Sequence, residues 1–149
     1  MKKLWKIVLC TALVLLLAAC GKNAKTTWQE QYDLGMQYLE DGDYEQAIVA
    51  FTAAIEIDSK QAVVYVGRAQ AHIGSGETEE NLSAALTDYE SALALDDMNP
   101  DIYLGIADVY IRQEDYEKAE EILNRAIEKL GENEAVRNKI QEIASENAK

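Results

Sequence analysis

Two short phrases that each occur twice constrain this chain more than any other feature of its sequence. Residues 43–47 (DYEQA) return as residues 115–119 (DYEKA), and residues 54–56 (AIE) return unchanged as residues 126–128, both after 72 positions. Ala92 lies between the two copies of AIE, 38 residues after Ala54 and 34 residues before Ala126. A period of 34 residues is typical of a unit of two helices, and such units stack so that each covers the apolar face of its neighbour.

Three successive units resemble the tetratricopeptide repeat. Small residues stand where two helices would cross closely, and large residues stand where they would fill the space between neighbours. The matching positions are Leu34, Gly35, Tyr38, Gly42, Tyr44, Ala47, Phe51, Ala54; Tyr65, Ala69, His72, Ala85, Tyr89, Ala92; and Tyr103, Ala107, Tyr110, Tyr116, Ala119, Leu123, Ala126. The resemblance implies an all-α fold, a right-handed array of three helical hairpins closed by a C-terminal capping helix. It divides the chain into units at 28–61, 62–99 and 100–133, with the capping helix at 134–149.

The middle unit is four residues longer than the others, and the extra residues fall near 77–81, between its two helices. Residues 74–76 (GSG) predict a longer turn there, and the glutamates that follow begin or extend the next helix. Asp43 and Asp115 each precede a new helix and are predicted to be N-caps. The capping helix is predicted from one apolar stripe, formed by Val136, Ile140, Ile143 and Ala144.

The N-terminal residues have the composition of an export signal. Residues 1–19 contain three lysines and no acid, and the apolar run from Ile7 is short for a membrane-spanning helix, which needs about 20 residues. Residues 17–21 (LAACG) resemble the lipobox of bacterial lipoproteins, which implies cleavage before Cys20 and attachment of diacylglycerol to it, with or without an N-acyl chain. Residues 20–27 then form a lipidated cysteine and a flexible tether. The alternative is an ordinary signal peptide with a chance cysteine.

The charge of the chain limits the partners that it can bind. The formal net charge is −13, from 27 acidic and 14 basic residues. A nucleic-acid partner requires a basic patch, which the sequence lacks, and an anionic lipid surface would repel this charge. We therefore expect no nucleic-acid partner, and contact with the membrane through the lipid anchor only.

No arrangement of residues in the sequence indicates catalysis or a metal site. Cys10 lies in the segment predicted to be removed and Cys20 is predicted to carry lipid, so no thiol remains for a Cys–His pair. The single histidine, His72, occupies an aromatic signature position and is interpreted as a packed residue. Residues 97–101 (DMNPD) resemble the start of a calcium loop, but the glycine and glutamate that such a loop needs later are absent. We predict no enzyme, no small-molecule substrate, no metal, and no cofactor beyond the lipid on Cys20.

In arrays of this family the first helix of each hairpin lines a concave face, so the resemblance places candidate partner-binding positions on three helices. These positions are Gln29, Tyr32, Met36, Val63, Val66, Gln70, Asp101, Leu104, Asp108 and Arg112. Some members of the family hold a peptide carboxylate there with Lys, Asn and Arg, but other residues occupy the matching positions of this chain: Tyr32, Met36, Gly67, Asp101 and Gly105. The acids favour a basic or neutral peptide. The alternative is that three hairpins form no deep groove and that Tyr32, Val66 and Leu104 only pack the hairpins together.

Together these features predict a membrane-anchored bacterial lipoprotein that acts as a protein–protein interaction scaffold or adaptor at the cell envelope. Its partner would be an unidentified envelope protein or peptide. Its location would be the outer face of the cytoplasmic membrane, or the outer membrane in a host with two membranes. The alternative function is a structural or self-associating envelope lipoprotein without a peptide-binding groove.

Overall fold

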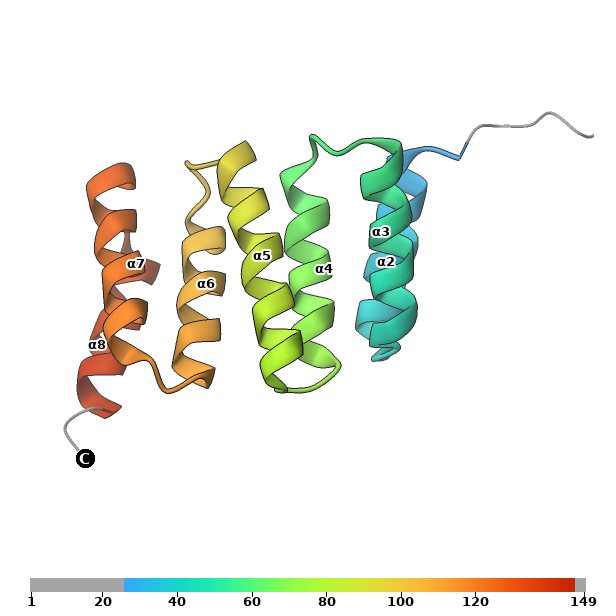
Figure 1. Ribbon diagram of the computed structural model, residues 1–149. Helices are drawn as coiled ribbons and strands as arrows, with labels where there is room; N and C mark the ends of the chain where they lie inside the picture. Colours follow the sequence, from blue (N-terminus) through green and yellow to red (C-terminus); the bar gives the residue numbers. More distant parts are fainter. Residues whose placement is uncertain (1–25, 147–149) are drawn as a thin grey trace, which may run out of the picture.

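The protein folds into an array of antiparallel helices, seen in a computed structural model that describes residues 26–146 (Figure 1). Within those residues there are seven helices and no strand. In chain order the helices are α2 (Trp28–Asp41), α3 (Tyr44–Ile57), α4 (Ala62–Gly74), α5 (Glu79–Leu95), α6 (Pro100–Arg112), α7 (Tyr116–Leu130) and α8 (Glu134–Glu146). The predicted all-α array of three hairpins and a capping helix is confirmed, while the predicted signal segment and Cys20 lie outside the described residues.

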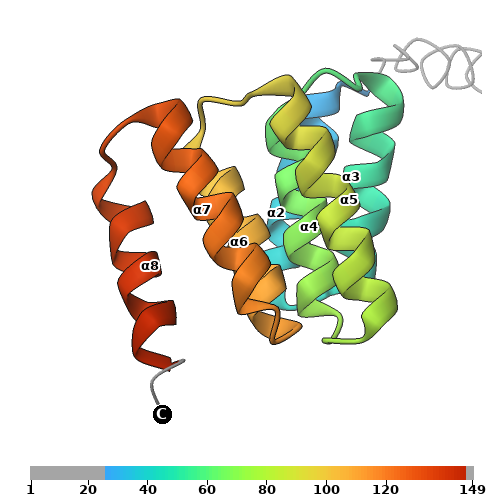
Figure 2. The same ribbon diagram turned by 60° about the vertical axis from the view of Figure 1, so that its left-hand side comes forward.

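The helices form two layers (Figure 1). One layer contains α2, α4, α6 and α8, and the other contains α3, α5 and α7. Each helix packs against the next one in the chain, so that three hairpins stand side by side and α8 follows beside α7 (Figure 2). Contacts therefore follow the order of the sequence, as expected when each unit covers the apolar face of its neighbour.

Side-chain caps fix where some of the helices begin. At α2 the Thr27 hydroxyl accepts a hydrogen bond from the Glu30 N–H at 3.2 Å, and the Glu30 carboxylate accepts one from the Thr27 N–H at 3.0 Å. This reciprocal pair satisfies two N–H groups that a helix start leaves without partners. Asp115, predicted to be an N-cap, accepts from the Lys118 N–H at 3.2 Å. Asp43 also precedes its helix, but its side chain makes no capping hydrogen bond.

The extra residues of the middle unit lengthen both a turn and a helix. α4 ends at Gly74, and α5 begins at Glu79 after the N-cap Thr78, whose hydroxyl accepts from the Asn81 N–H. The Asn81 side-chain amide also donates to the Gly76 carbonyl oxygen at 3.0 Å, which braces the turn. As a result α5 has 17 residues, compared with 14 in α3 and 15 in α7.

The core consists of two clusters, one between the first two units and a larger one that continues to α8. Phe51 is fully buried in the first cluster, and Val136 and Ile143 of α8 are fully buried in the second. Ile140 is half-buried, but Ala144 is exposed, so the predicted apolar stripe of α8 is one residue too wide. Adjacent residues on a helix point about 100° apart, which turns Ala144 away from the face that Ile143 buries.

Candidate functional site

A groove runs along the layer of α2, α4 and α6, with a volume of about 480 Å³. Apolar and polar side chains both line it. Eight of the ten positions predicted from the sequence are among its lining residues, namely Tyr32, Met36, Val63, Val66, Gln70, Asp101, Leu104 and Asp108. Tyr32, Val66 and Leu104 also pack against the core, so these side chains both hold the hairpins together and face the groove.

Two of the predicted positions do not line the groove. Gln29 is exposed in the first turn of α2. Arg112 lies at the end of α6, where its guanidinium donates a hydrogen bond to the Glu77 carboxylate in the turn before α5. Repeat spacing could not have predicted this ion pair, because Glu77 belongs to the extra residues of the middle unit and has no counterpart in the other units.

Phe51 determines how closely α2 and α4 approach at the floor of the groove. A Cβ atom added at Gly35 of α2 would lie 2.6 Å from the Phe51 ring, and one added at Gly67 of α4 would also lie 2.6 Å from it. The ring therefore occupies the space above two helical backbones that carry no side chain there. The Tyr32 ring packs against the same ring, with centroids 5.9 Å apart.

Sequence reasoning missed Tyr89, which comes from α5 in the other layer and still lines the groove. Its ring lies over Gly105 of α6, where an added Cβ atom would be 2.4 Å from the ring carbon Cζ. A sequence signal for this contact exists, since Tyr89 precedes Gly105 by the same interval that separates Phe51 from Gly67. Asn99 also lines the groove and was not predicted.

The charged residues that line the groove are acidic. Asp108 is paired, because its carboxylate lies 2.9 Å from the Lys139 ammonium of α8, which also lies 3.1 Å from Glu142. Burial disfavours the charged form of Lys139, but its hydrogen bonds to these two carboxylates outweigh burial and raise its pKa. Burial, together with the charge of Asp108, raises the pKa of Tyr89 to about 12. Asp101 is in no ion pair within residues 26–146, so its carboxylate is the unpaired one of the groove.

An ion pair within the second unit is also hydrogen-bonded to the first unit. The Arg68 guanidinium of α4 donates to both carboxylate oxygens of Asp88 on α5, at 2.9 and 2.6 Å, and to the Thr52 hydroxyl of α3 at 3.1 Å. The Asp88 residue is only 3% exposed, and its hydrogen bonds raise the pKa of Arg68. His72 is half-buried, with Nε2 3.8 Å from the Asp88 carboxylate. Burial lowers the pKa of His72, against the opposing effect of Asp88.

In the turn at residues 97–101, which resembles a calcium loop in sequence, polar side chains bond to other groups of the protein. The Asn99 side chain accepts a hydrogen bond from the Asp101 N–H, which starts α6, and Asp97 pairs with the Lys129 ammonium of α7. Within residues 26–146 no group of three or more His, Cys, Asp or Glu side chains is arranged to hold a metal ion. None of the helices in that part of the chain is long and apolar enough to cross a membrane.

The model of the tetratricopeptide repeat family matches residues 38–81 and 78–143, which together make up more than half of the chain. The chain therefore belongs to the tetratricopeptide repeat family, whose members are generally non-enzymatic interaction modules. A curated relative, the Protein SGT1 homolog of Oryza sativa subsp. japonica, is 37% identical over 83 residues. That match covers 56% of this chain and 22% of the relative, so the chain spans about a fifth of the relative's length.

Solved structures with the same fold come from several proteins. The first repeat domain of Spaghetti (RPAP3), bound to the HSP90 peptide SRMEEVD, has a TM-score of 0.70 at 21% identity and covers 83% of this chain and 97% of that one. The Sgt2 domain from Aspergillus fumigatus has a TM-score of 0.69 at 20% identity, covering 81% and 79%. The Yersinia enterocolitica secretion chaperone SycD, in complex with a YopD peptide, has a TM-score of 0.65 at 18% identity, covering 78% and 86%. At these identities the similarity is one of fold.

Proposed function

We propose that this protein is a lipid-anchored envelope adaptor that holds a segment of a partner protein in the groove on α2, α4 and α6. The observation that carries the proposal is the groove itself, which gathers apolar and polar side chains from three successive helices on one surface. Such a surface suits a peptide segment, because the apolar side chains supply contact area and the polar ones fix its position. Membership of a family of interaction modules supports this assignment.

The charges of the groove define the chemistry of the partner segment. The peptide bound to the Spaghetti domain, SRMEEVD, is rich in acids. None of the residues that line the groove of this chain is Lys or Arg, and Asp101 is an acid without an ion-pair partner in the described residues. A segment with aliphatic side chains and a lysine or arginine near Asp101 fits this groove better than an acidic one. The partner is therefore a basic or neutral peptide.

The membrane attachment rests on the sequence of residues 17–21, whose cysteine would carry diacylglycerol after export, with or without an N-acyl chain. Two or more acyl chains anchor a protein stably, whereas a single chain binds only marginally. The short segment from Cys20 to Thr27 would keep the array close to the outer face of the cytoplasmic membrane, or to the outer membrane in a host with two membranes. The partner must then lie near the membrane.

A pair of matched valine substitutions tests the groove. Val63 is 45% exposed and lines the groove, whereas Val49 is 64% exposed on α3, in the other layer. We expect Val63→Lys to weaken association with cross-linked envelope partners by about tenfold or more, while Val49→Lys leaves it unchanged. Both substitutions place a charge at an exposed position of a helix. If both variants lose the partners equally, or if neither variant loses them, the groove is not the binding surface.

The Cys20→Ala variant tests the anchor separately. We expect it to lose metabolic labelling by fatty acid and to keep residues 1–19 uncleaved, and to fold normally. If the fatty-acid label is retained, the anchor assignment is wrong, whatever the groove binds. Sedimentation of the wild-type chain in detergent tests the alternative of a self-associating lipoprotein, which predicts a specific oligomer that Val63→Lys dissociates.

A further inference from the structure

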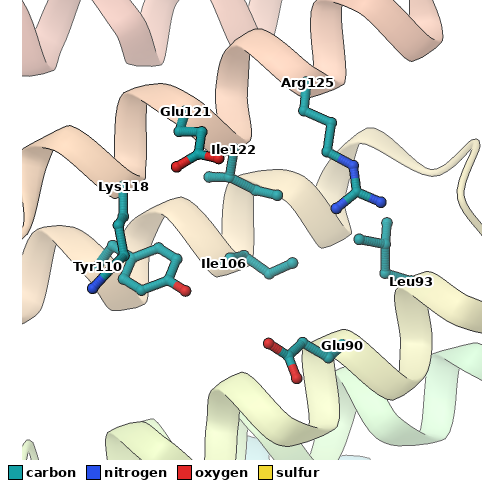
Figure 3. Close-up of a pocket in the computed structure, with 8 residues that line it drawn as sticks. All are labelled: Glu90, Leu93, Ile106, Tyr110, Lys118, Glu121, Ile122 and Arg125. Carbon is teal, nitrogen blue, oxygen red and sulfur yellow. The ribbon is translucent and has the colours of Figure 1, made fainter.

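A second depression lies on the opposite side of the array, between α5 and α7 (Figure 3). We call it the α5–α7 cleft. It has a volume of about 200 Å³, and its apolar floor is formed by Leu93, Ile106 and Ile122. Along α5 it continues past Ala94 toward Asp97. The cleft uses none of the residues that line the groove, so it is a separate surface of the same array.

The preceding junction of the array shows why this space is open. One unit earlier, the residues in the positions of Ile106 and Ile122 are Arg68 and Asp88, and their ion pair, with its hydrogen bond to Thr52, occupies the corresponding place. An isoleucine is shorter than an arginine and makes no hydrogen bond across the gap. Glu90, which stands in the position of Thr52, is exposed and has no Arg68 to bind. The second junction therefore has an apolar floor and an acid at its edge where the first junction has a closed polar network.

Charged side chains line both walls of the cleft, with an acid on α5 and two bases and one acid on α7. From α5, the charged group at the cleft's centre is Glu90, while Lys118, Glu121 and Arg125 come from α7 (Figure 3). Lys118 is already held by Asp115 at 2.6 Å. No ion pair within residues 26–146 joins Glu90 or Arg125 to another side chain, although they stand on facing walls.

Each wall also has the spacing of a helix surface. The lining residues of α7, from Lys118 to Arg125, follow at intervals of three, one and three residues. Those of α5, from Glu90 to Ala94, follow at intervals of three and one, and Asp97 lies in the turn beyond the helix. The stretch on α7 covers two turns, about 10 Å. A third helix laid between α5 and α7 would meet these stripes with its own side chains at matching intervals.

We infer that the α5–α7 cleft receives an amphipathic helix of a partner protein, with an aliphatic ridge on Ile106 and Ile122. The flank of that helix facing α5 carries a lysine or arginine for Glu90, and the flank facing α7 carries an acid for Arg125. Burial of the ridge supplies the affinity, and the two charge pairs fix the direction in which the helix lies. This inference does not depend on the lipid anchor or on the groove, and it gives the array a second interaction surface.

Three synthetic peptides test the inference against the full-length chain in detergent micelles. Each is an alanine-based helix with leucines at intervals of three and four residues. The first carries Arg on one flank and Glu on the other, the second carries Arg on both flanks, and the third carries Glu on both. Binding is measured by fluorescence anisotropy at physiological salt. We expect the mixed peptide to bind about tenfold more tightly than either of the others. The net charge of the chain favours the all-Arg peptide, so tightest binding of that peptide would overturn the inference.

Charge reversal at Arg125 provides the second measurement. Arg125→Glu makes both walls acidic, so the preference should pass from the mixed peptide to the all-Arg peptide. Arg137→Glu on α8 is the matched control, because it makes the same charge change at an exposed position outside the cleft and should leave the order unchanged. The same order of peptides in both variants would overturn the inference. Loss of mixed-peptide binding in Val63→Lys would also overturn it, since the groove would then be the binding surface.

A double substitution that copies the first junction provides a third measurement. Ile106→Arg with Ile122→Asp places the Arg68–Asp88 pair in the cleft, and we expect it to reduce binding of the mixed peptide by about tenfold or more. Circular dichroism reports whether the double variant folds. If the double variant does not fold, the Arg125→Glu measurement tests the proposed site. Unchanged binding by a folded double variant would contradict the proposed site. Displacement of the mixed peptide by free amino acids would instead indicate a small-molecule site and would also contradict it.

Discussion

Removal of the Asp88 carboxylate should destabilise the array, because it leaves the Arg68 guanidinium without its ion-pair partner. Asp88 accepts two hydrogen bonds from Arg68, at 2.9 and 2.6 Å, and its side chain is 4% exposed. Breaking one partner of a buried ion pair costs about 3–5 kcal/mol, because the other charge is left without compensation. Arg68 keeps a 22% exposed side chain and its hydrogen bond to Thr52, which places the expected loss near the lower end, about 3 kcal/mol.

Urea unfolding of the chain from Thr26 onward, followed by helical circular dichroism, measures this loss for Asp88→Ala. The informative companion is the double variant Arg68→Ile, Asp88→Ile, which copies Ile106 and Ile122 of the next junction. Replacing both partners of a buried pair with apolar residues is often nearly neutral, so the double variant should lose about 1 kcal/mol or less. A double variant less stable than Asp88→Ala would refute the reasoning, since the pair would then stabilise the fold beyond compensating for its own burial.

Three further predictions concern other parts of the array. Gly67→Ala should cost about 1–3 kcal/mol, because the new Cβ atom would lie 2.6 Å from the buried Phe51 ring; a second change, Phe51→Leu, should recover part of the loss in urea unfolding if the contact is the cause. The lowered pKa of His72 means that the unfolded chain binds its proton more readily, so stability should fall as the pH drops below about 6.5. This pH dependence should be weaker in His72→Gln, and an identical slope in that variant would contradict the assignment. Ile143→Ala should cost about 2–5 kcal/mol and should increase hydrogen exchange in α8 before it does so in α4, because Ile143 is fully buried at the end of the array.

The helices, the hairpin order and most of the groove could be predicted from the sequence because they depend on periodicity. A helix repeats its faces at fixed intervals, and the 34-residue unit repeats its helices. Positions such as Tyr32, Val66 and Leu104 therefore recur at the same place in each unit, and the structure brings them to one surface. The same reasoning failed where a unit departs from the period, as at Arg112, whose partner Glu77 lies among the extra residues.

Contacts between units could not be predicted in the same way, because they depend on which particular side chains meet, and the repeat spacing does not determine those side chains. The charge of the groove is an example, because Lys139 of α8 pairs with Asp108, and the carboxylate of Asp101 has no such partner within residues 26–146. Equivalent positions can therefore have different neighbours, even in units with the same backbone.

The all-helical tetratricopeptide array could be predicted from the sequence, because a helix period and a unit repeat are local patterns along the chain. Which surfaces of the array are open could be seen only once the helices were packed together. Arg68 and Asp88 close the first junction, while Ile106 and Ile122 in the same positions leave the second open. The physical reason is that an open or a filled space depends on the lengths and hydrogen bonds of side chains from three helices together, and those helices lie far apart in the sequence.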